Sequence, residues 1–157
     1  MYYLLLITSF LMISCQPKQI DTAQVDMLVE TYFKFQKALT EDSSEHTAHY
    51  IADIRKSAKT LEIDQSVKQR LLTSLDAYNG ISDLKTQRNL FQELSNSVAL
   101  LINTVGYSSD VYVMQCPMAF EGKGGTWLQA STDLINPYYG SEMLKCGDQV
   151  TVIAAKN

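Results

Sequence analysis

The sequence is poor in the residues that most often carry enzymatic or metal chemistry. Its 157 residues include two histidines, three cysteines and one tryptophan. The absence of a Cys-x-x-Cys pair argues against structural zinc, and no Ser-His-Asp or Cys-His arrangement is evident for nucleophilic catalysis. Lysine and arginine form no basic block, and the net charge is −4, which argues against nucleic acid as a partner. We therefore predict a protein that is not an enzyme and does not bind nucleic acid.

The N-terminal segment predicts export. Residues 1–14 are uncharged and mostly apolar, but shorter than the roughly 20 residues that a membrane-spanning helix needs. They match the hydrophobic region of a secretion signal. The end of this segment and the residue after it, Met12-Ile13-Ser14-Cys15, resemble a bacterial lipobox. Methionine stands where leucine is usual, and no lysine or arginine precedes the apolar run. An ordinary signal peptide with an incidental cysteine is the alternative.

These features predict a signal peptide over residues 1–14, lipidation of Cys15 and a tether over residues 15–21. The protein would then be a lipoprotein of the bacterial cell envelope, anchored to a membrane and facing the periplasm or the cell surface. The remaining residues, 22–157, suffice for one domain with a hydrophobic core, since 46% of the chain is hydrophobic and 19% is charged.

Residues 22–106 have the apolar period of amphipathic helices. We expect four of them, over about 22–40, 45–61, 65–79 and 83–105. Candidate N-caps are Asp21 or Thr22, Ser44, Asp64, and Ser82 or Asp83, and glycines 80 and 106 end the last two helices. Four such helices with short connections predict a mainly α fold, a four-helix up-and-down bundle.

Residues 107–157 have a different composition. Val111–Met114 and Val150–Ile153 are rich in β-branched residues and predict two short antiparallel strands. Most of the glycines and two of the three prolines lie between them, in a stretch of about thirty residues that we expect to be irregular. Long loops in small domains tend to be functional, and the strands would bring the two ends of this loop close together.

Four sulfur-containing residues bracket that loop: Cys116, Met118, Met143 and Cys146, here called the sulfur quartet. Thiolates and thioethers are soft ligands that select Cu(I) over hard cations. An even pair of cysteines in an oxidising compartment is also a disulfide candidate, which would stabilise the fold by roughly 3–4 kcal/mol. The methionines would then only fill the core. From the residues alone the disulfide is the simpler interpretation.

A family resemblance favours the metal. The segments that carry it are Cys116-Pro117-Met118-Ala119-Phe120, Gly122-Lys123-Gly124-Gly125, Trp127-Leu128, Ile135-Asn136-Pro137-Tyr138-Tyr139-Gly140 and Met143-Leu144-Lys145-Cys146-Gly147. They resemble a bacterial domain-of-unknown-function family found in small envelope lipoproteins and fused to periplasmic adaptors of copper and silver efflux pumps. Gly125 stands where that family usually has alanine, and Gln129 where serine often follows Trp-Leu.

The resemblance implies a Cu(I) or Ag(I) chaperone, buffer or efflux accessory. Cys116 and Cys146 would be the primary ligands, and Met118 and Met143 would complete the shell. Trp127, Tyr138 and Tyr139 would cover the site, or would simply be aromatic core. The implied partner is a heavy-metal efflux adaptor or another envelope copper protein. Two alternatives stay open: an interaction module whose Cys116–Cys146 disulfide rigidifies a docking loop, and a redox cycle between metal-bound dithiol and disulfide.

Overall fold

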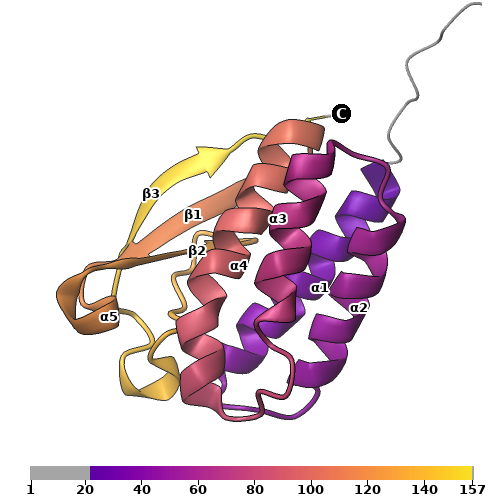
Figure 1. Ribbon diagram of the computed structural model, residues 1–157. Coiled ribbons are helices and arrows are strands. Elements are labelled where there is room, and N and C mark those ends of the chain that lie inside the picture. Colours follow the sequence, from indigo (N-terminus) through magenta and orange to yellow (C-terminus); the bar gives the residue numbers. More distant parts are fainter. Residues whose placement is uncertain (1–21, 157) are drawn as a thin grey trace, which may run out of the picture.

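Four long helices form the N-terminal part of the molecule in the computed structural model, which describes residues 22–156 (Figure 1). They are α1 (Thr22–Thr40), α2 (Thr47–Thr60), α3 (Gln65–Asp76) and α4 (Leu84–Val105). The prediction of a mainly α fold is confirmed, with 55% of the described residues helical. The predicted signal peptide, Cys15 and tether lie outside the described residues. None of the helices described here has the length and apolar content needed to cross a membrane.

Two of the predicted caps fix helix boundaries. Asp64 Oδ1 accepts hydrogen bonds from the backbone N–H of Ser66 (2.8 Å) and Val67 (3.3 Å) at the start of α3. Asp83 Oδ1 accepts one from Thr86 N (2.8 Å) at the start of α4. Each carboxylate satisfies an N–H group that the first helical turn leaves unpaired. At the other end of α4, Gly106 has φ +110, a conformation that suits glycine.

The prediction that Ser44 caps the second helix is wrong. The residue before α2 is His46, with φ +64 and no side-chain cap bond. Ser44 instead offers its carbonyl to Thr47, whose hydroxyl donates to it at 2.9 Å. The chain makes a tight turn here, between two helices that pack against each other, and the left-handed His46 leads directly into α2.

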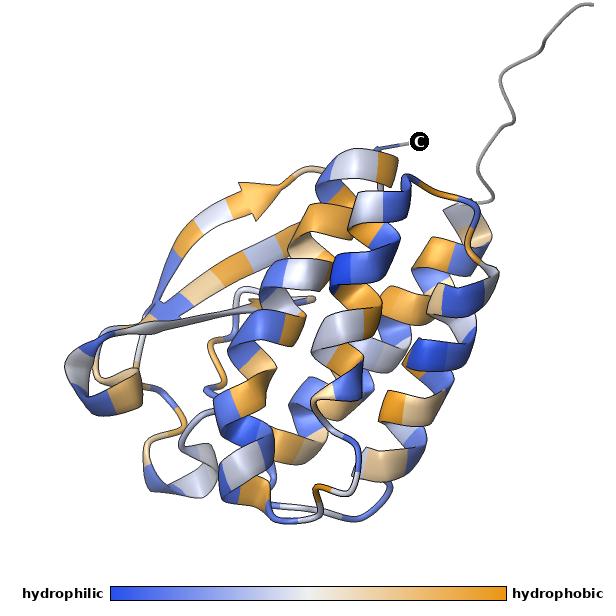
Figure 2. Cartoon of the chain, viewed as in Figure 1, coloured by the Kyte–Doolittle hydropathy of each residue, from blue (hydrophilic) through white to orange (hydrophobic). Residues whose placement is uncertain are grey.

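The helices share an aromatic centre. The rings of Tyr32 and Phe91 stack at 5.2 Å, and Phe35 meets Phe91 edge-on at 5.6 Å. All three side chains are fully buried. Hydrophobic and hydrophilic residues are interspersed along each of these helices, as expected for amphipathic helices (Figure 2).

A three-stranded antiparallel sheet follows, with the order β2-β1-β3. Its strands are β1 (Val111–Cys116), β2 (Gly125–Gln129) and β3 (Asp148–Ile153). The two predicted strands exist and pair with each other, but the prediction missed β2 inside the supposed loop. In β2, Trp127 lies opposite Met114 of β1 and Gly125 lies opposite Cys116. Pairing with β1 therefore explains why this segment forms a strand although it begins with a glycine. A short turn labelled α5 (Ala119–Gly122) joins β1 to β2, and a 3-10 turn η1 (Gly140–Glu142) precedes β3.

The sheet attaches to the helices through β2. The backbone N–H of Leu128 donates to the Tyr32 hydroxyl at 3.1 Å, and that hydroxyl also bonds Ser95 Oγ at 2.7 Å. Burial strongly raises the pKa of Tyr32, so the hydroxyl stays protonated and can serve both partners. In Figure 1 β2 lies beside α4, whereas β3 forms the far side of the sheet.

Candidate functional site

The two cysteines of the sulfur quartet face each other. Their Sγ atoms are 2.9 Å apart, although 30 positions separate them in the sequence. Cys116 ends the central strand β1 and is fully buried, whereas Cys146 lies on the loop before β3 and is partly exposed. The pair is therefore anchored in the core on one side and reachable from solvent on the other.

The turn after Cys116 is left-handed. Phe120 (φ 53, ψ 50) and Glu121 (φ 59, ψ 37) both occupy a region that side chains other than glycine rarely adopt, and Gly122 follows with φ +83. Such conformations cost free energy and persist only where the surroundings impose them. Here the Phe120 ring packs edge-on against Tyr138 at 5.0 Å. The result is a tight connection that presents Met118 at the surface, with 53% of its area exposed.

Asn136 organises the loop that carries Cys146. Its side-chain amide donates to the Cys146 carbonyl, its backbone N–H donates to the Leu144 carbonyl, and its Oδ1 accepts from Tyr138 N, each at 2.8 Å. The residue is completely buried. The sequence does not reveal this role, because a contact between residues ten positions apart leaves no local pattern.

Two of the three aromatic residues proposed as site cover are core residues. Trp127 is 1% exposed, and its indole N–H donates to Gln129 Oε1 at 3.1 Å. The Tyr138 ring meets Trp127 edge-on at 5.8 Å, and its hydroxyl donates to the Thr126 carbonyl. Both rings are thus buried in the core and do not form an exposed lid over the cysteine pair.

Tyr139 is the aromatic residue that reaches the rim of the site. It is partly exposed, and its hydroxyl donates to the Met118 carbonyl at 2.7 Å, tying the Cys146 loop to the turn after β1. Its pKa is raised by desolvation and, to a smaller extent, by the negative charge that Cys116 and Cys146 would carry as thiolates.

The methionines are not equivalent. Met118 is largely exposed, whereas Met143 is partly buried and its carbonyl accepts a hydrogen bond from Cys146 N at 3.1 Å. The structure thus brings the two cysteines together. Met118, two residues after Cys116 in the sequence, is exposed to solvent.

The thiols influence each other electrostatically. The hydrogen bond to Cys116 raises the pKa of Cys146 to about 11, with further contributions from desolvation and from the negative charges of Cys116 and Asp148. Deprotonating both sulfurs would place two negative charges in contact. A soft cation between them would remove that repulsion, and so would a covalent S–S bond.

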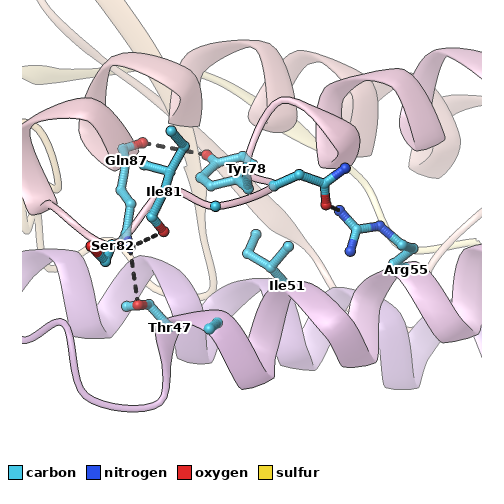
Figure 3. Close-up of a pocket in the computed structure, with 10 residues that line it drawn as sticks. Thr47, Ile51, Arg55, Tyr78, Ile81, Ser82 and Gln87 are labelled. Atoms are coloured by element: carbon cyan, nitrogen blue, oxygen red, sulfur yellow. Dashed lines mark hydrogen bonds between the residues drawn. The ribbon is translucent and has the colours of Figure 1, made fainter.

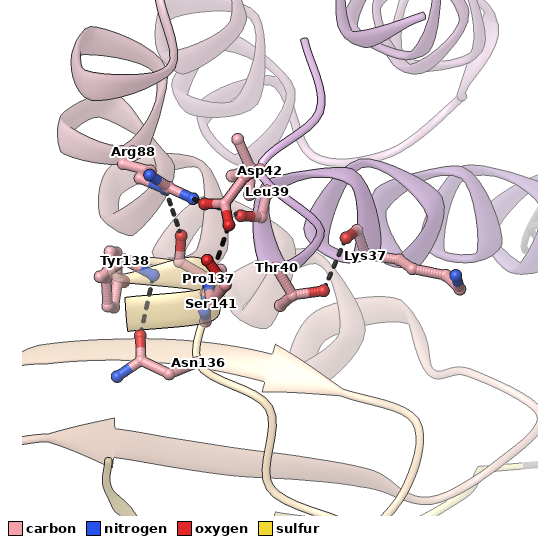
Figure 4. A network of polar contacts seen from close by, with 9 residues as sticks. All are labelled: Lys37, Leu39, Thr40, Asp42, Arg88, Asn136, Pro137, Tyr138 and Ser141. Carbon is pink, nitrogen blue, oxygen red and sulfur yellow. Dashed lines mark hydrogen bonds and ion pairs between the residues drawn. The ribbon is translucent and has the colours of Figure 1, made fainter. Parts of the chain in front are cut away.

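A polar network fastens this loop to the helices (Figure 4). Arg88 of α4 donates to the Leu39 carbonyl at 2.7 Å and to the Pro137 carbonyl at 3.0 Å, and also pairs with Asp42. Asp42 in turn accepts from Ser141 N at 3.0 Å. Bonds to Ser141 and Arg88 lower the pKa of Asp42 to about 2, so the carboxylate is ionised at any physiological pH.

Within residues 22–156 no group of three or more His, Cys, Asp and Glu side chains is placed to hold a metal ion. The two histidines pair with acidic neighbours instead, His46 with Glu45 and His49 with Asp53, both at 3.2 Å.

A cavity of about 380 Å³ lies elsewhere, between α2 and the α3–α4 connection (Figure 3). Its charged residue, Arg55, already donates to the Leu75 carbonyl at 2.7 Å and to Asn79 Oδ1 at 2.8 Å. Gln87 donates to Thr47 Oγ1 at 3.1 Å. These bonds close the end of α3 and hold α4 against α2, whereas two other buried polar atoms of the lining, Arg55 Nε and Gln87 Oε1, make no hydrogen bond within the described part of the chain.

Comparison with known proteins gives no match: no family model, no curated protein and no solved structure is similar to this chain. The resemblance noted from the sequence therefore stays a prediction, and the geometry of the cysteine pair carries the functional argument.

Proposed function

We propose that this protein binds Cu(I) or Ag(I) through Cys116 and Cys146 and acts as a metal chaperone, buffer or efflux accessory in the bacterial envelope. The observation that carries the proposal is the contact of the two thiols at 2.9 Å on a partly exposed rim. Thiolates select soft monovalent cations, and the chain offers two thioethers in the same segments. The proposed role requires binding and release, not catalysis.

Metal binding requires a small movement. Metal–thiolate bonds of about 2.3 Å, as in zinc sites, place two sulfurs of a tetrahedral shell roughly 3.8 Å apart. The observed 2.9 Å must therefore open by about 1 Å. Of the two cysteines, Cys146 is the one that can move, because it lies on a loop whereas Cys116 belongs to the central strand. Binding would release the thiol protons, and exchange with the sulfurs of a donor would transfer the metal stepwise.

The methionines would complete the shell. Met118 is exposed and two residues from Cys116, so its thioether can turn towards a bound ion, and Met143 lies three residues before Cys146. Tyr139 holds the backbone of Met118 and would fix the approach of that ligand.

The second candidate is a disulfide, and the same distance supports it. An S–S bond is about 2.0 Å long, so the two sulfurs would have to approach each other by about 1 Å from their observed separation. Loss of two protons and of two electrons to an envelope oxidant would join the sulfurs and fix the loop. The protein would then be an interaction module with a rigid docking loop, or would cycle between metal-bound dithiol and disulfide.

The location of the protein and the arrangement of its helices belong to the same proposal. We place the protein at the membrane through a lipid on Cys15, with an efflux adaptor or another envelope copper protein as its partner. We also propose that α1 to α4 form an up-and-down bundle. This is supported by the contacts of α1 with α2, α2 with α3, α3 with α4 and α1 with α4.

One titration separates the two candidates. Protein reduced with a phosphine would compete for Cu(I) against a chromophoric chelator, beside the Cys116→Ser/Cys146→Ser variant. Binding tighter than micromolar that disappears in the variant supports the metal site. If reduced protein takes no metal from the chelator, and untreated protein from the envelope resists alkylation at both cysteines, the metal proposal fails and the disulfide replaces it.

A further inference from the structure

The two edges of the sheet differ in their surroundings. The edge formed by β2 is covered, because Leu128 N–H donates to Tyr32 and the strand packs against α4. The outer edge of β3 pairs with no other strand in the described part of the chain, because β3 is the last strand of the sheet and its extensive contacts are with β1. Figure 1 shows β3 at the rim of the molecule, and Figure 2 shows several hydrophobic residues along it.

This edge lacks most of the features that protect exposed strands from pairing. Residues 149–153 contain neither charge nor proline, and Val150 and Val152 are 57% and 39% exposed. One protective feature exists: the register shift opposite Val113 and Met114 leaves Val150 as an extra residue in β3. The strand therefore carries β-branched side chains and main-chain groups that are available to another strand.

We propose that β3 pairs antiparallel with β3 of a second copy of this chain, around a two-fold axis at Thr151. This register places Val150 opposite Val152 of the partner subunit, and by symmetry Val152 opposite the partner's Val150. Both exposed valines become cross-strand neighbours, which is a favourable pair. Asp148 would lie opposite Ala154 of the partner subunit, and the next charged residue along that strand is the partner's Lys156. Like charges would therefore not face each other.

A second copy fits this edge because a two-fold interface must be self-complementary. The joined sheet would have six strands. Its strand contact is shorter than the interfaces of about 1,200–2,000 Å² that hold stable dimers, so the dimer is weak and concentration-dependent.

The dimer leaves the cysteine pairs separate. Asp148, the first residue of β3, lies three residues from the proposed axis, so at about 3.3 Å per residue the two copies of Asp148 are roughly 20 Å apart, and Cys146 lies on the loop before it. No ligand would be shared between copies. The pairing is therefore independent of the proposed metal site, and either can fail without the other.

Sedimentation velocity of the full chain carrying Cys15→Ser, in reductant and from micromolar to millimolar concentration, tests the pairing. We expect the sedimentation coefficient to rise with concentration. The further change Val152→Lys should hold it at the monomer value, because a charge in the middle of the edge opposes pairing. Thr132→Lys, which adds the same charge at an exposed turn away from β3, should behave as the parent.

Circular dichroism melting of all variants shows that they fold, and Val150→Lys provides a second disruption of the same edge. Slower amide exchange of Gln149–Val152 at high concentration would support the pairing directly. A parent that stays monomeric throughout, or a dimer that survives both lysine substitutions, overturns the proposal. In the first case a strand from a different protein becomes the occupant to seek.

Discussion

The side-chain amide of Asn136 donates to the carbonyl oxygen of Cys146 at 2.8 Å, so a completely buried residue ten positions away fixes one half of the cysteine pair. The same side chain accepts from Tyr138 N. Asn136 therefore links the loop beside the sulfurs to the aromatic core, and its loss should affect both stability and the site.

Replacement of Asn136 by alanine leaves the Cys146 carbonyl and the Tyr138 N–H without their partner. Each unsatisfied buried group costs about 1–3 kcal/mol, so we expect the free energy of unfolding to fall by roughly 2–4 kcal/mol. Urea unfolding measures the change. The control is Asn89→Ala, at an exposed position of α4, which should alter stability by less than about 0.5 kcal/mol. Equal effects of the two substitutions would contradict the role of Asn136.

Met118→Leu tests the thioether beside the cysteines. If this sulfur completes the shell, Cu(I) affinity should fall by roughly ten- to a hundredfold, while folding is preserved because the side chain is 53% exposed. Met27 on α1 is also exposed, at 68%, and offers a matched control. Chelator competition should show no change for Met27→Leu. Unchanged affinity in both variants would restrict the site to the two cysteines.

The alkylation rate of Cys146 should report its raised pKa. Since contact with Cys116 raises the pKa of Cys146 to about 11, little thiolate is present at pH 8, and reaction with iodoacetamide should be slow there and accelerate towards pH 11. Cys116→Ala removes the hydrogen bond and the neighbouring charge, so the profile should move towards the ordinary value of 9.0. Mass spectrometry of quenched samples gives the rates. An identical profile in the variant would show that Cys116 does not control Cys146.

Asp42 predicts a loss of stability in acid. Its pKa is lowered from 3.8 to about 2 in the folded protein, so its contribution is complete above about pH 4 and is lost as pH falls towards 2. The carboxylate is more than one-third exposed, and we expect a contribution of roughly 1 kcal/mol after solvent screening. Asp42→Asn should flatten the unfolding free energy over that interval. Asparagine also tolerates the φ of +54 at this position.

The control for this pH dependence is Asp133→Asn. Asp133 is 80% exposed and pairs with Lys145 at 2.5 Å on the surface. Its substitution should leave the acid limb of the stability curve parallel to that of the parent. If Asp133→Asn flattens the curve as much as Asp42→Asn does, the network in Figure 4 is not the source of the effect.

The four long helices could be predicted from the sequence, because their signals are local. An apolar period, a capping carboxylate such as Asp64 or Asp83 and a stopping glycine act within a few residues of each other. The sequence also predicted that two β-branched segments would pair and that the cysteines at their ends would approach.

The remaining features depend on contacts between distant parts of the chain. β2 forms because β1 provides a strand to pair with, and Asn136 reaches Cys146 because the loop folds back. His46, and not Ser44, precedes α2. The same applies to the roles of Trp127, Tyr138 and Tyr139, which share a motif but divide between core and rim. Each of these depends on residues far apart in the chain, whose contacts exist only once the helices and strands have packed.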